Sequence, residues 1–387
     1  MAALLPIEGS CDARFAALRD AFADNFRERG ELGAAVAVYL DGRRVVDLWS
    51  GWADVARRRP WRADTLVNVF SVGKALIALC AHQLVERRRL DLDTPLTRWW
   101  PEIGAAGKEA LTLRHVLSHR AGLPALAEPL ADDAMLDWRR IVGALERQPP
   151  WWPIGSDHGY HVNTFGFLLG ELVRRVEGET IGKVLRREIA VPLEADVHIG
   201  LPEEYHGRVA EFLWTEIPPA PIPALLSDDD RMRWFTYFNP AGFSGAGGWI
   251  NDRRWRSAEL PSTNAHGTAR GVARIYAALA AGGALDGVHV LGRDTLAAAR
   301  VEHSCGFDRI TQRPSRFALG FQLTQPERPL GPNPGAFGHF GAGGSLGFCD
   351  PEAGVAFAYV MNEMGPRWQN PRNRALIEAV YDSIGEA

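Results

Sequence analysis

The chain has 387 residues, of which 46% are hydrophobic and 23% are charged, and its formal net charge is −4. This composition is ordinary for a globular protein that is long enough to form one large or two smaller domains, and it excludes a disordered chain. The acidic balance argues against a nucleic-acid-binding protein, because such proteins are more often basic.

The cysteines are too scattered to suggest a zinc knuckle or a disulfide framework, since none of them forms a C-x-x-C pair. No segment approaches the roughly 18 apolar residues that a membrane span requires. The N-terminus lacks the basic and apolar regions of a secretory signal. We therefore expect a cytoplasmic protein without a nucleic-acid or membrane partner. The sequence leaves its oligomeric state open.

The N-terminal part predicts a helix followed by a β-hairpin. Apolar side chains recur at helical spacing from Phe15 to Phe26. Residues 34–40 and 45–49 are rich in β-forming side chains, and Asp41-Gly42 between them is a typical hairpin turn.

A serine and a lysine three positions apart, Ser71 and Lys74, begin an apolar segment that has no charged residue from Ala75 to Ala81. Residues at this spacing lie on one face of a helix, so the lysine can reach the serine hydroxyl. Burial disfavours the ammonium form of lysine, and a neutral amine beside a serine is a base beside a nucleophile. S-x-x-K is a signature of serine β-lactamases and penicillin-binding proteins, although the pair by itself is weak evidence.

The middle of the chain predicts helices and long loops. Thr112 can cap a short helix that Gly122 and Pro124 end. His115 and His119 are four apart, which could suit a metal, but no third ligand is evident and we expect a structural role. Residues 165–176 and 271–279 have helical patterns. The proline-rich segment 215–223 cannot be a helix or an inner strand, and either covers a cleft or only connects.

Strand patterns return near the C-terminus. Alternating apolar residues predict a strand over 317–323, residues 355–361 predict another, and 373–384 predict a closing helix. Sheet patterns therefore lie at both ends of the chain. We expect one sheet domain formed by residues 1–70 and 312–387, with a mainly helical domain, 71–311, inserted and the site between the two.

Three motifs in order carry a resemblance to class C β-lactamases and family VIII carboxylesterases. They are Ser71-Val-Gly-Lys74, Tyr160-His-Val-Asn163 and His339-Phe-Gly341. Flanking stretches such as 90–95, 113–123 and 152–155 agree with it. The resemblance covers most of the chain, and it implies the β-lactamase/transpeptidase-like α/β fold, with a mainly antiparallel sheet, flanking helices and an inserted helical domain.

The resemblance also implies roles for individual residues. Ser71 would be the nucleophile, Lys74 would accept its proton, and Tyr160 would be a second base whose phenolate a nearby ammonium favours. The backbone N–H groups of Ser71 and Ala342 would form the oxyanion hole. No metal or cofactor is implied. We also expect four further residues to line the substrate site: Gly341, His339, Asn163 and Trp152.

Two departures from the β-lactamase pattern favour esters. Those enzymes usually carry a lysine where this chain has His339, and an asparagine two positions after the tyrosine, where this chain has Val162. The expected function is a serine carboxylesterase that acts on small, short-chain esters. The alternatives are a β-lactamase or D-amino-acid peptidase or amidase of the same fold, and a non-catalytic ligand-binding protein.

One competing motif has to be weighed. Gly343-Gly-Ser345-Leu-Gly347 matches the nucleophile elbow G-x-S-x-G, which needs a strand before it and a helix after it. Pro351 follows shortly, in a segment that leads to a turn and a strand. We therefore expect Ser345 to be structural, and His161 and His339 to line the site rather than serve a Ser-His-Asp triad.

Overall fold

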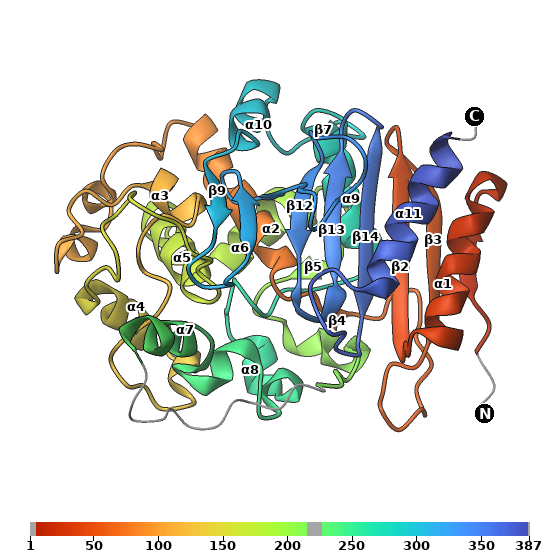
Figure 1. The fold of residues 1–387 in the computed structure, drawn as a ribbon, viewed down its shortest axis with the longest axis horizontal. Coiled ribbons are helices and arrows are strands. Elements are labelled where there is room, and N and C mark those ends of the chain that lie inside the picture. The colour runs from red at the N-terminus through yellow and green to blue at the C-terminus, as the bar shows by residue number, and fades with distance from the viewer. Residues whose placement is uncertain (1–4, 215–226, 386–387) are drawn as a thin grey trace.

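A central antiparallel sheet draws its strands from both ends of the chain. The computed structural model describes residues 5–214 and 227–385. Within this part, nine strands pair in the order β1-β3-β2-β14-β13-β12-β11-β10-β9 (Figure 1). Their bounds are β1 Glu8–Cys11, β2 Gly33–Leu40, β3 Arg43–Gly51, β9 Ser304–Phe307, β10 Pro314–Phe317, β11 Gln322–Leu323, β12 Phe337–Phe340, β13 Leu346–Asp350 and β14 Val355–Met361.

Two smaller sheets lie outside it. One consists of β4 (Val67–Asn68), β6 (His266–Gly267) and β5 (Val197–His198), and the other of β7 (Ala284–Leu285) and β8 (Val288–His289). The helices are α1 Ala16–Glu28, α2 Val72–Glu86, α3 Leu113–Leu117, α4 Trp138–Arg147, α5 Thr164–Glu177, α6 Ile181–Leu185, α7 Asp228–Phe238, α8 Arg253–Ser257, α9 Ala269–Ala280, α10 Arg293–Ala299 and α11 Pro371–Gly385.

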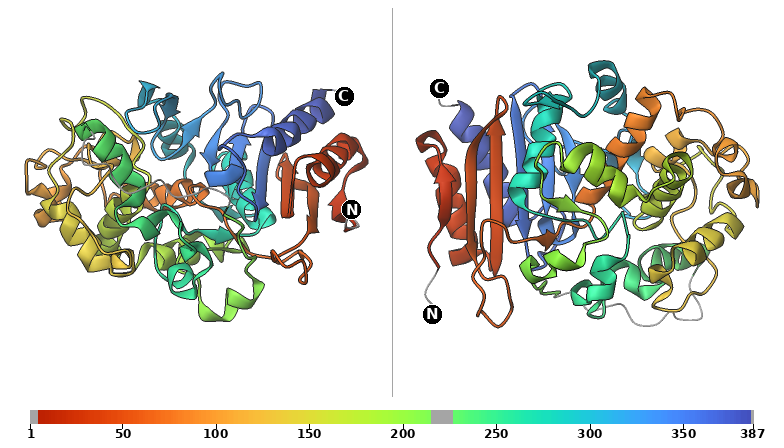
Figure 2. Two further views of the ribbon diagram at one scale, coloured as in Figure 1. Left: turned by 60° about the horizontal axis from the view of Figure 1, so that its bottom comes forward. Right: turned by 180° about the vertical axis from the view of Figure 1, so that it is seen from behind.

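Strands from the N-terminal and C-terminal parts of the chain pair within this sheet. β14 pairs with β2 over seven residue pairs, from Val355 opposite Leu40 to Met361 opposite Ala34. Every residue of β14 is buried, as expected for a strand covered on both faces. Helices α1 and α11 pack together on one face, and α9 covers β2, β13 and β14 on the other (Figure 2).

Helix α2 connects the sheet with the helical part of the molecule. Its apolar stretch from Ala75 to Ala81 is fully buried, which is why the helix contacts β12 on one side and α5 and α6 on the other. Figure 1 places α3, α4, α5 and α7 beyond α2, on the side of the molecule away from α1 and α11. The start of α2 therefore lies between the sheet and the helices.

Most of the expected elements are confirmed. The first helix, the hairpin around Asp41-Gly42, the capped short helix after Thr112, the two central helices, the strand 355–361 and the closing helix are all present. The fold is the β-lactamase/transpeptidase-like fold, with an antiparallel sheet and flanking helices. The proline-rich segment 215–223 lies outside the described residues.

The single strand expected over 317–323 is wrong. β10 ends at Phe317, the chain turns, and β11 begins at Gln322, which pairs with Phe317. Gly320 adopts φ 89°, and a Cβ at this position would lie 2.2 Å from the Cβ of Ala78 in α2. The turn therefore needs a glycine, both for its backbone conformation and for its close approach to α2.

The predicted domain boundaries remain a prediction. The sheet layer also includes residues that the prediction placed in the helical part, because β9 pairs with β10 and α9 packs on the sheet.

Candidate active site

The start of helix α2 holds Ser71 and Lys74 in contact. Ser71 is the N-cap residue, and the Nζ of Lys74 lies 3.0 Å from its Oγ. The amine also donates to the carbonyl oxygens of Val162, at 2.6 Å, and Ser262, at 3.0 Å. These three contacts hold the amine of Lys74 in position beside the Ser71 hydroxyl.

Lys74 is fully buried, and no carboxylate of the described residues forms an ion pair with it. Because burial penalises the ammonium form, the pKa of Lys74 lies well below its ordinary value of 10.5. The neutral amine has a lone pair, so it can accept a proton from the Ser71 hydroxyl.

The backbone before Ser71 is held in an unusual conformation. Phe70 has φ 49°, in the left-handed region that bulky residues rarely adopt. Its N–H donates to Oδ1 of Asn68 at 3.2 Å, and the preceding carbonyl of Val69 accepts the hydroxyl of Ser345 at 3.0 Å. This turn directs Ser71 to the cavity that Phe70 also lines.

Tyr160 lies in the loop before α5 with its ring beside the lysine. The Nζ of Lys74 is 4.8 Å from the ring centroid, and the ring of Phe317 stacks parallel to it at 5.8 Å. The buried phenol oxygen has no hydrogen-bond partner of normal geometry among the described residues, although the Ser71 hydroxyl is close enough to interact with it. Burial raises the pKa of Tyr160 well above 10, and the neighbouring Ser71 hydroxyl acts in the opposite direction.

These directions correct one expectation. The sequence suggested that a neighbouring ammonium would hold Tyr160 as a phenolate. Burial instead lowers the pKa of Lys74 and raises that of Tyr160, so it favours the neutral amine and the neutral phenol over an ammonium–phenolate pair.

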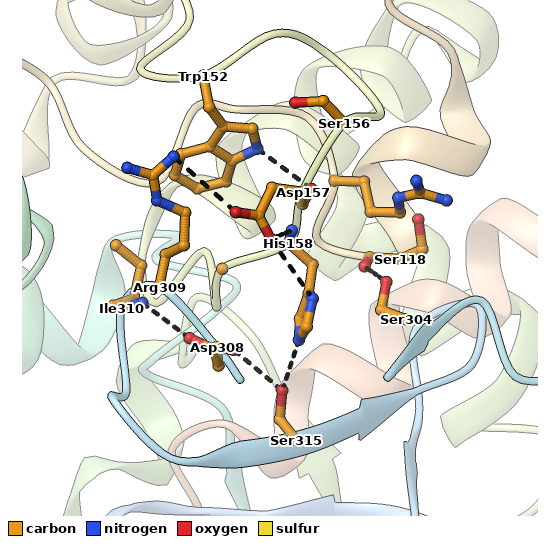
Figure 3. Close-up of polar contacts among 12 residues, drawn as sticks. Ser118, Trp152, Ser156, Asp157, His158, Ser304, Asp308, Arg309, Ile310 and Ser315 are labelled. Atoms are coloured by element: carbon orange, nitrogen blue, oxygen red, sulfur yellow. Dashed lines mark hydrogen bonds and ion pairs between the residues drawn. The ribbon is translucent and has the colours of Figure 1, made fainter. Parts of the chain in front are cut away.

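A buried carboxylate holds the Tyr160 loop in place. Figure 3 shows this residue, Asp308, in contact with Ile310 and Ser315. Asp308 is fully buried, and its oxygens accept the backbone N–H groups of Tyr160, Ile310 and Thr311. The hydroxyl of Ser315 donates to it at 3.2 Å and also contacts Nε2 of His158 at 3.0 Å. Although Ser315 and His158 are in contact, Ser315 is 1% exposed, so this pair supports the loop and cannot reach a substrate.

The glycine-rich segment after β12 forms the opposite wall. A Cβ on Gly341 would lie 2.1 Å from Oγ of Ser345 and 2.5 Å from the carbonyl oxygen of Val69, so the chain can pass there only as glycine. Among the described residues, neither the N–H of Ser71 nor that of Ala342 donates to a protein acceptor. Both residues line the cavity, so both donors are available to a developing oxyanion.

The cavity in front of Ser71 has a volume of about 260 Å³. Its walls are largely aromatic and apolar, with two arginines at the side. The lining residues are Phe70, Ser71, Tyr160, Val162, Trp214, Tyr237, Phe238, Ser244, Ala246, Thr263, Arg313, Ala342, Gly343, Met364, Gly365, Pro366, Arg367 and Trp368.

Several residues expected to touch substrate lie behind this wall. Asn163 uses both ends of its amide internally, donating to Thr236 and accepting from Thr263. Trp152 is 3% exposed and donates to the carbonyl of Asp157. Neither lines the cavity.

The histidines near the site are also buried. His339 in β12 is 1% exposed and contacts the Phe340 carbonyl through Nδ1, and burial lowers its pKa to about 3. The pKa of His161 is likewise lowered to about 3 by burial. Neither residue lines the cavity, so both support it from behind as neutral rings.

The pair His115 and His119 and the segment around Ser345 both have structural roles. His115 accepts the N–H of Thr112 through Nδ1 in a capping box, and His119 packs on the ring of Tyr160 at 4.9 Å. Within residues 5–214 and 227–385, no group of three or more His, Cys, Asp or Glu side chains could hold a metal ion. Ser345 is fully buried and precedes a strand, so it is not a nucleophile elbow.

The sequence analysis did not identify three residues that line the cavity and lie far from the motifs in the sequence. Trp368 packs edge-on against the Tyr160 ring at 5.1 Å, and Arg313 and Arg367 lie beside it. They come from loops before β10 and α11 that contain no recognisable motif. Asp308 was missed for the same reason, since its role depends on the folding of two separate loops.

Comparisons with known proteins agree with this geometry. The beta-lactamase family model matches residues 18–382. The esterase/beta-lactamase LipL of Mycobacterium tuberculosis is 38% identical over 365 residues, covering 92% of this chain and 83% of that protein.

Two solved structures are similar over almost the whole chain. The crystal structure of a family VIII carboxylesterase has a TM-score of 0.89 at 37% identity, covering 98% of this chain and 100% of that one. A penicillin-binding protein homolog from Caulobacter crescentus has a TM-score of 0.89 at 40% identity, with the same coverage.

The chain therefore belongs to the beta-lactamase family. Its relatives support a serine hydrolase of this fold. No helix of the described residues is long and apolar enough to cross a membrane.

Proposed function

We propose that the protein is a serine carboxylesterase that cleaves small carboxylic esters through an acyl-Ser71 intermediate. The observation that carries this proposal is the buried Lys74, whose Nζ lies 3.0 Å from Oγ of Ser71 at the floor of an aromatic cavity and whose pKa is lowered by burial. The esterase names of its relatives support the same class of reaction.

In the proposed acylation, Oγ of Ser71 attacks the ester carbonyl while its proton passes to the Nζ of Lys74. The N–H groups of Ser71 and Ala342 stabilise the oxyanion. When the C–O bond of the ester breaks, the leaving alkoxide takes the phenolic proton of Tyr160, and the Lys74 ammonium restores it. A neutral Lys74 then remains, with Ser71 acylated and the alcohol released.

Deacylation uses the same groups in reverse. A water attacks the acyl carbon, and its proton passes through the Tyr160 phenol to Lys74. Collapse of the tetrahedral intermediate returns a proton to Oγ of Ser71 and releases the carboxylic acid. Burial favours the neutral form of both groups, so in this scheme each step begins without an unpaired charge in the site.

The same-fold alternative is a β-lactamase or a D-amino-acid peptidase or amidase. The position of the third motif disfavours it, because His339 is buried and neutral and does not line the cavity, so it cannot hold the carboxylate of a β-lactam as a lysine would. A non-catalytic binding role is also disfavoured, because Ser71, Lys74 and Tyr160 are all retained and lie next to one another.

The test compares hydrolysis of p-nitrophenyl esters of graded acyl length with that of a chromogenic cephalosporin, using wild type and Ser71→Ala. We expect ester turnover that Ser71→Ala abolishes, and an acyl adduct on Ser71 in the mass spectrum of the quenched enzyme. Faster turnover of the cephalosporin would favour the β-lactamase alternative. Absence of both turnover and adduct would favour the binding protein.

A further inference from the structure

The charged side chains of the cavity wall are all positive. Among the described lining residues, the charged side chains are Arg313 and Arg367, and no aspartate or glutamate lines the cavity. The rest of the wall is aromatic, aliphatic or small. A neutral ester would need no such pair of cations, so they point to a property of the substrate other than the scissile carbonyl.

Both arginines have free hydrogen-bonding capacity. Within residues 5–214 and 227–385, neither guanidinium forms an ion pair, although nearby arginines do: Arg316 pairs with Glu302 at 2.6 Å, and Arg309 with Asp229 at 2.9 Å. Arg313 donates only from Nε, to the carbonyl of Thr311 at 3.3 Å. The outer N–H groups of both side chains are therefore available to a ligand.

Trp368 links these cations to the catalytic centre. Its ring contacts the Tyr160 ring at 5.1 Å, and the guanidinium carbon of Arg313 lies 5.6 Å from its centroid. Arg328 packs on the same ring at 5.5 Å and donates to the carbonyl of Pro314. A guanidinium held against an aromatic ring keeps the N–H donors at its edge directed outward.

Among the described residues, no nearby carboxylate forms an ion pair with Arg313 or Arg367. Asp308 is fully buried and already accepts three backbone N–H groups and a hydroxyl. Glu327 lines an adjoining cavity of about 610 Å³, which shares Pro366 and Arg367 with the first and also contains Arg29, Arg374 and Glu378. Arg374 and Glu378 form an ion pair at 3.0 Å, so Arg29, Arg367 and Glu327 are the charged side chains left there.

We propose that this site selects esters carrying a carboxylate remote from the scissile carbonyl, and that Arg313 and Arg367 bind that carboxylate. The aromatic wall would hold the carbon chain between the two ends. The inference rests on the proposed function, because it requires ester turnover at Ser71. It differs from the carboxylate recognition expected of a third-motif lysine, since His339 lies behind the wall and these arginines come from two other loops.

The experiment uses isosteric pairs of esters that differ only in charge. The p-nitrophenyl half-esters of adipic and suberic acid are compared with the corresponding esters in which a carboxamide replaces the free carboxylate. A second pair, 4-(butanoyloxy)benzoate and 4-(butanoyloxy)benzamide, places the charge on the alcohol side. The quantity measured is the ratio of kcat/KM for the anionic ester to that for the neutral one.

We expect this ratio to exceed 1 in the wild type for at least one pair, and to fall about three- to tenfold in Arg313→Gln and in Arg367→Gln, as for partly exposed charge contacts. It should also fall with added salt. Arg62→Gln is the matched control, because Arg62 is an exposed arginine in a different surface hollow and its removal changes the net charge equally. The control should retain the wild-type ratio.

The two proposals fail in different ways. If the neutral esters are hydrolysed in a Ser71-dependent reaction but the ratios stay at or below 1 and do not respond to either arginine, the carboxylate inference is overturned and the esterase assignment stands. If neither member of any pair is hydrolysed, both are overturned. An equal fall in Arg62→Gln would attribute the effect to overall charge and would also overturn the inference.

Discussion

Asp308 accepts the backbone N–H of Tyr160 with both oxygens of its carboxylate, at 3.2 and 3.1 Å, although 148 positions separate the two residues. We predict that Asp308→Asn lowers kcat tenfold or more and changes KM little, because the amide has only one acceptor oxygen and its NH₂ group opposes the surrounding N–H donors. One lost buried hydrogen bond should destabilise the fold by about 1–3 kcal/mol. Steady-state kinetics and denaturant unfolding measure the two effects.

Asp350→Asn provides the matched control for that variant. Asp350 is also a fully buried carboxylate without an ion pair, and it accepts from Asn333 at 2.9 Å and Tyr381 at 2.8 Å at the far end of β13. The Asp350→Asn variant should lose about as much stability as Asp308→Asn and keep the kcat of wild type. A similar loss of kcat in both variants would mean that Asp308 acts only through overall stability.

Tyr160→Phe should separate catalysis from stability. The phenylalanine keeps the packing on Phe317 and Trp368, and the Ser71 hydroxyl, which interacts with the phenol, keeps its contact with Lys74. We expect a fall in kcat of about 10²–10⁴-fold, the usual range for loss of a general acid–base group. The melting temperature should match that of wild type, and a marked decrease would show that the hydroxyl also stabilises the fold.

Lys74 should make stability depend on pH in a predictable direction. The folded-state pKa of Lys74 is well below its unfolded value of about 10.4, so between these values the unfolded chain binds more protons and stability rises with pH. The difference in unfolding free energy, wild type minus Lys74→Met, should therefore increase by up to about 1.4 kcal/mol per pH unit in this range. Urea unfolding at pH 7, 8 and 9 measures it.

Leu76→Met serves as the control, because it changes a buried, uncharged side chain of the same helix and keeps the lysine. Its difference from wild type should not vary with pH. If the Lys74→Met difference were equally flat, the amine would not be neutral in the folded protein.

Ser345→Ala tests the competing motif. Ser345 is fully buried, and its hydroxyl donates to the carbonyl of Val69. Its loss should lower stability by about 1 kcal/mol while ester turnover persists, whereas Ser71→Ala should abolish turnover and keep the fold. Complete inactivation of folded Ser345→Ala would contradict the choice of nucleophile.

The proximity of Ser71, Lys74 and Tyr160 could be predicted because local spacing sets much of it. Three residues along a helix bring Ser71 and Lys74 together, and Tyr160 follows from a second motif beside a helix start. The N–H donors of Ser71 and Ala342 were also anticipated, since glycines mark the close approach of the chain. Ser71, Tyr160 and Ala342 line one cavity, and Lys74 contacts Ser71 beside it.

The rest depended on contacts that local patterns do not encode. Alternation from Phe317 to Leu323 suggested one strand, but Gly320 meets Ala78 and forces a turn. Asn163 was expected to contact substrate, yet its amide is used between Thr236 and Thr263. The direction of the Tyr160 pKa shift required knowledge of its burial, which the tertiary structure determines.

The pairing of β2 with β14 has a consequence for biosynthesis. β2 ends at Leu40, whereas its partner strand β14 begins only at Val355. Until then the growing chain carries an apolar strand with an unpaired edge, which is a template for aggregation. Prematurely terminated products that lack β14 should therefore be insoluble, and refolding of the full chain should be slow because its central contact joins the two ends.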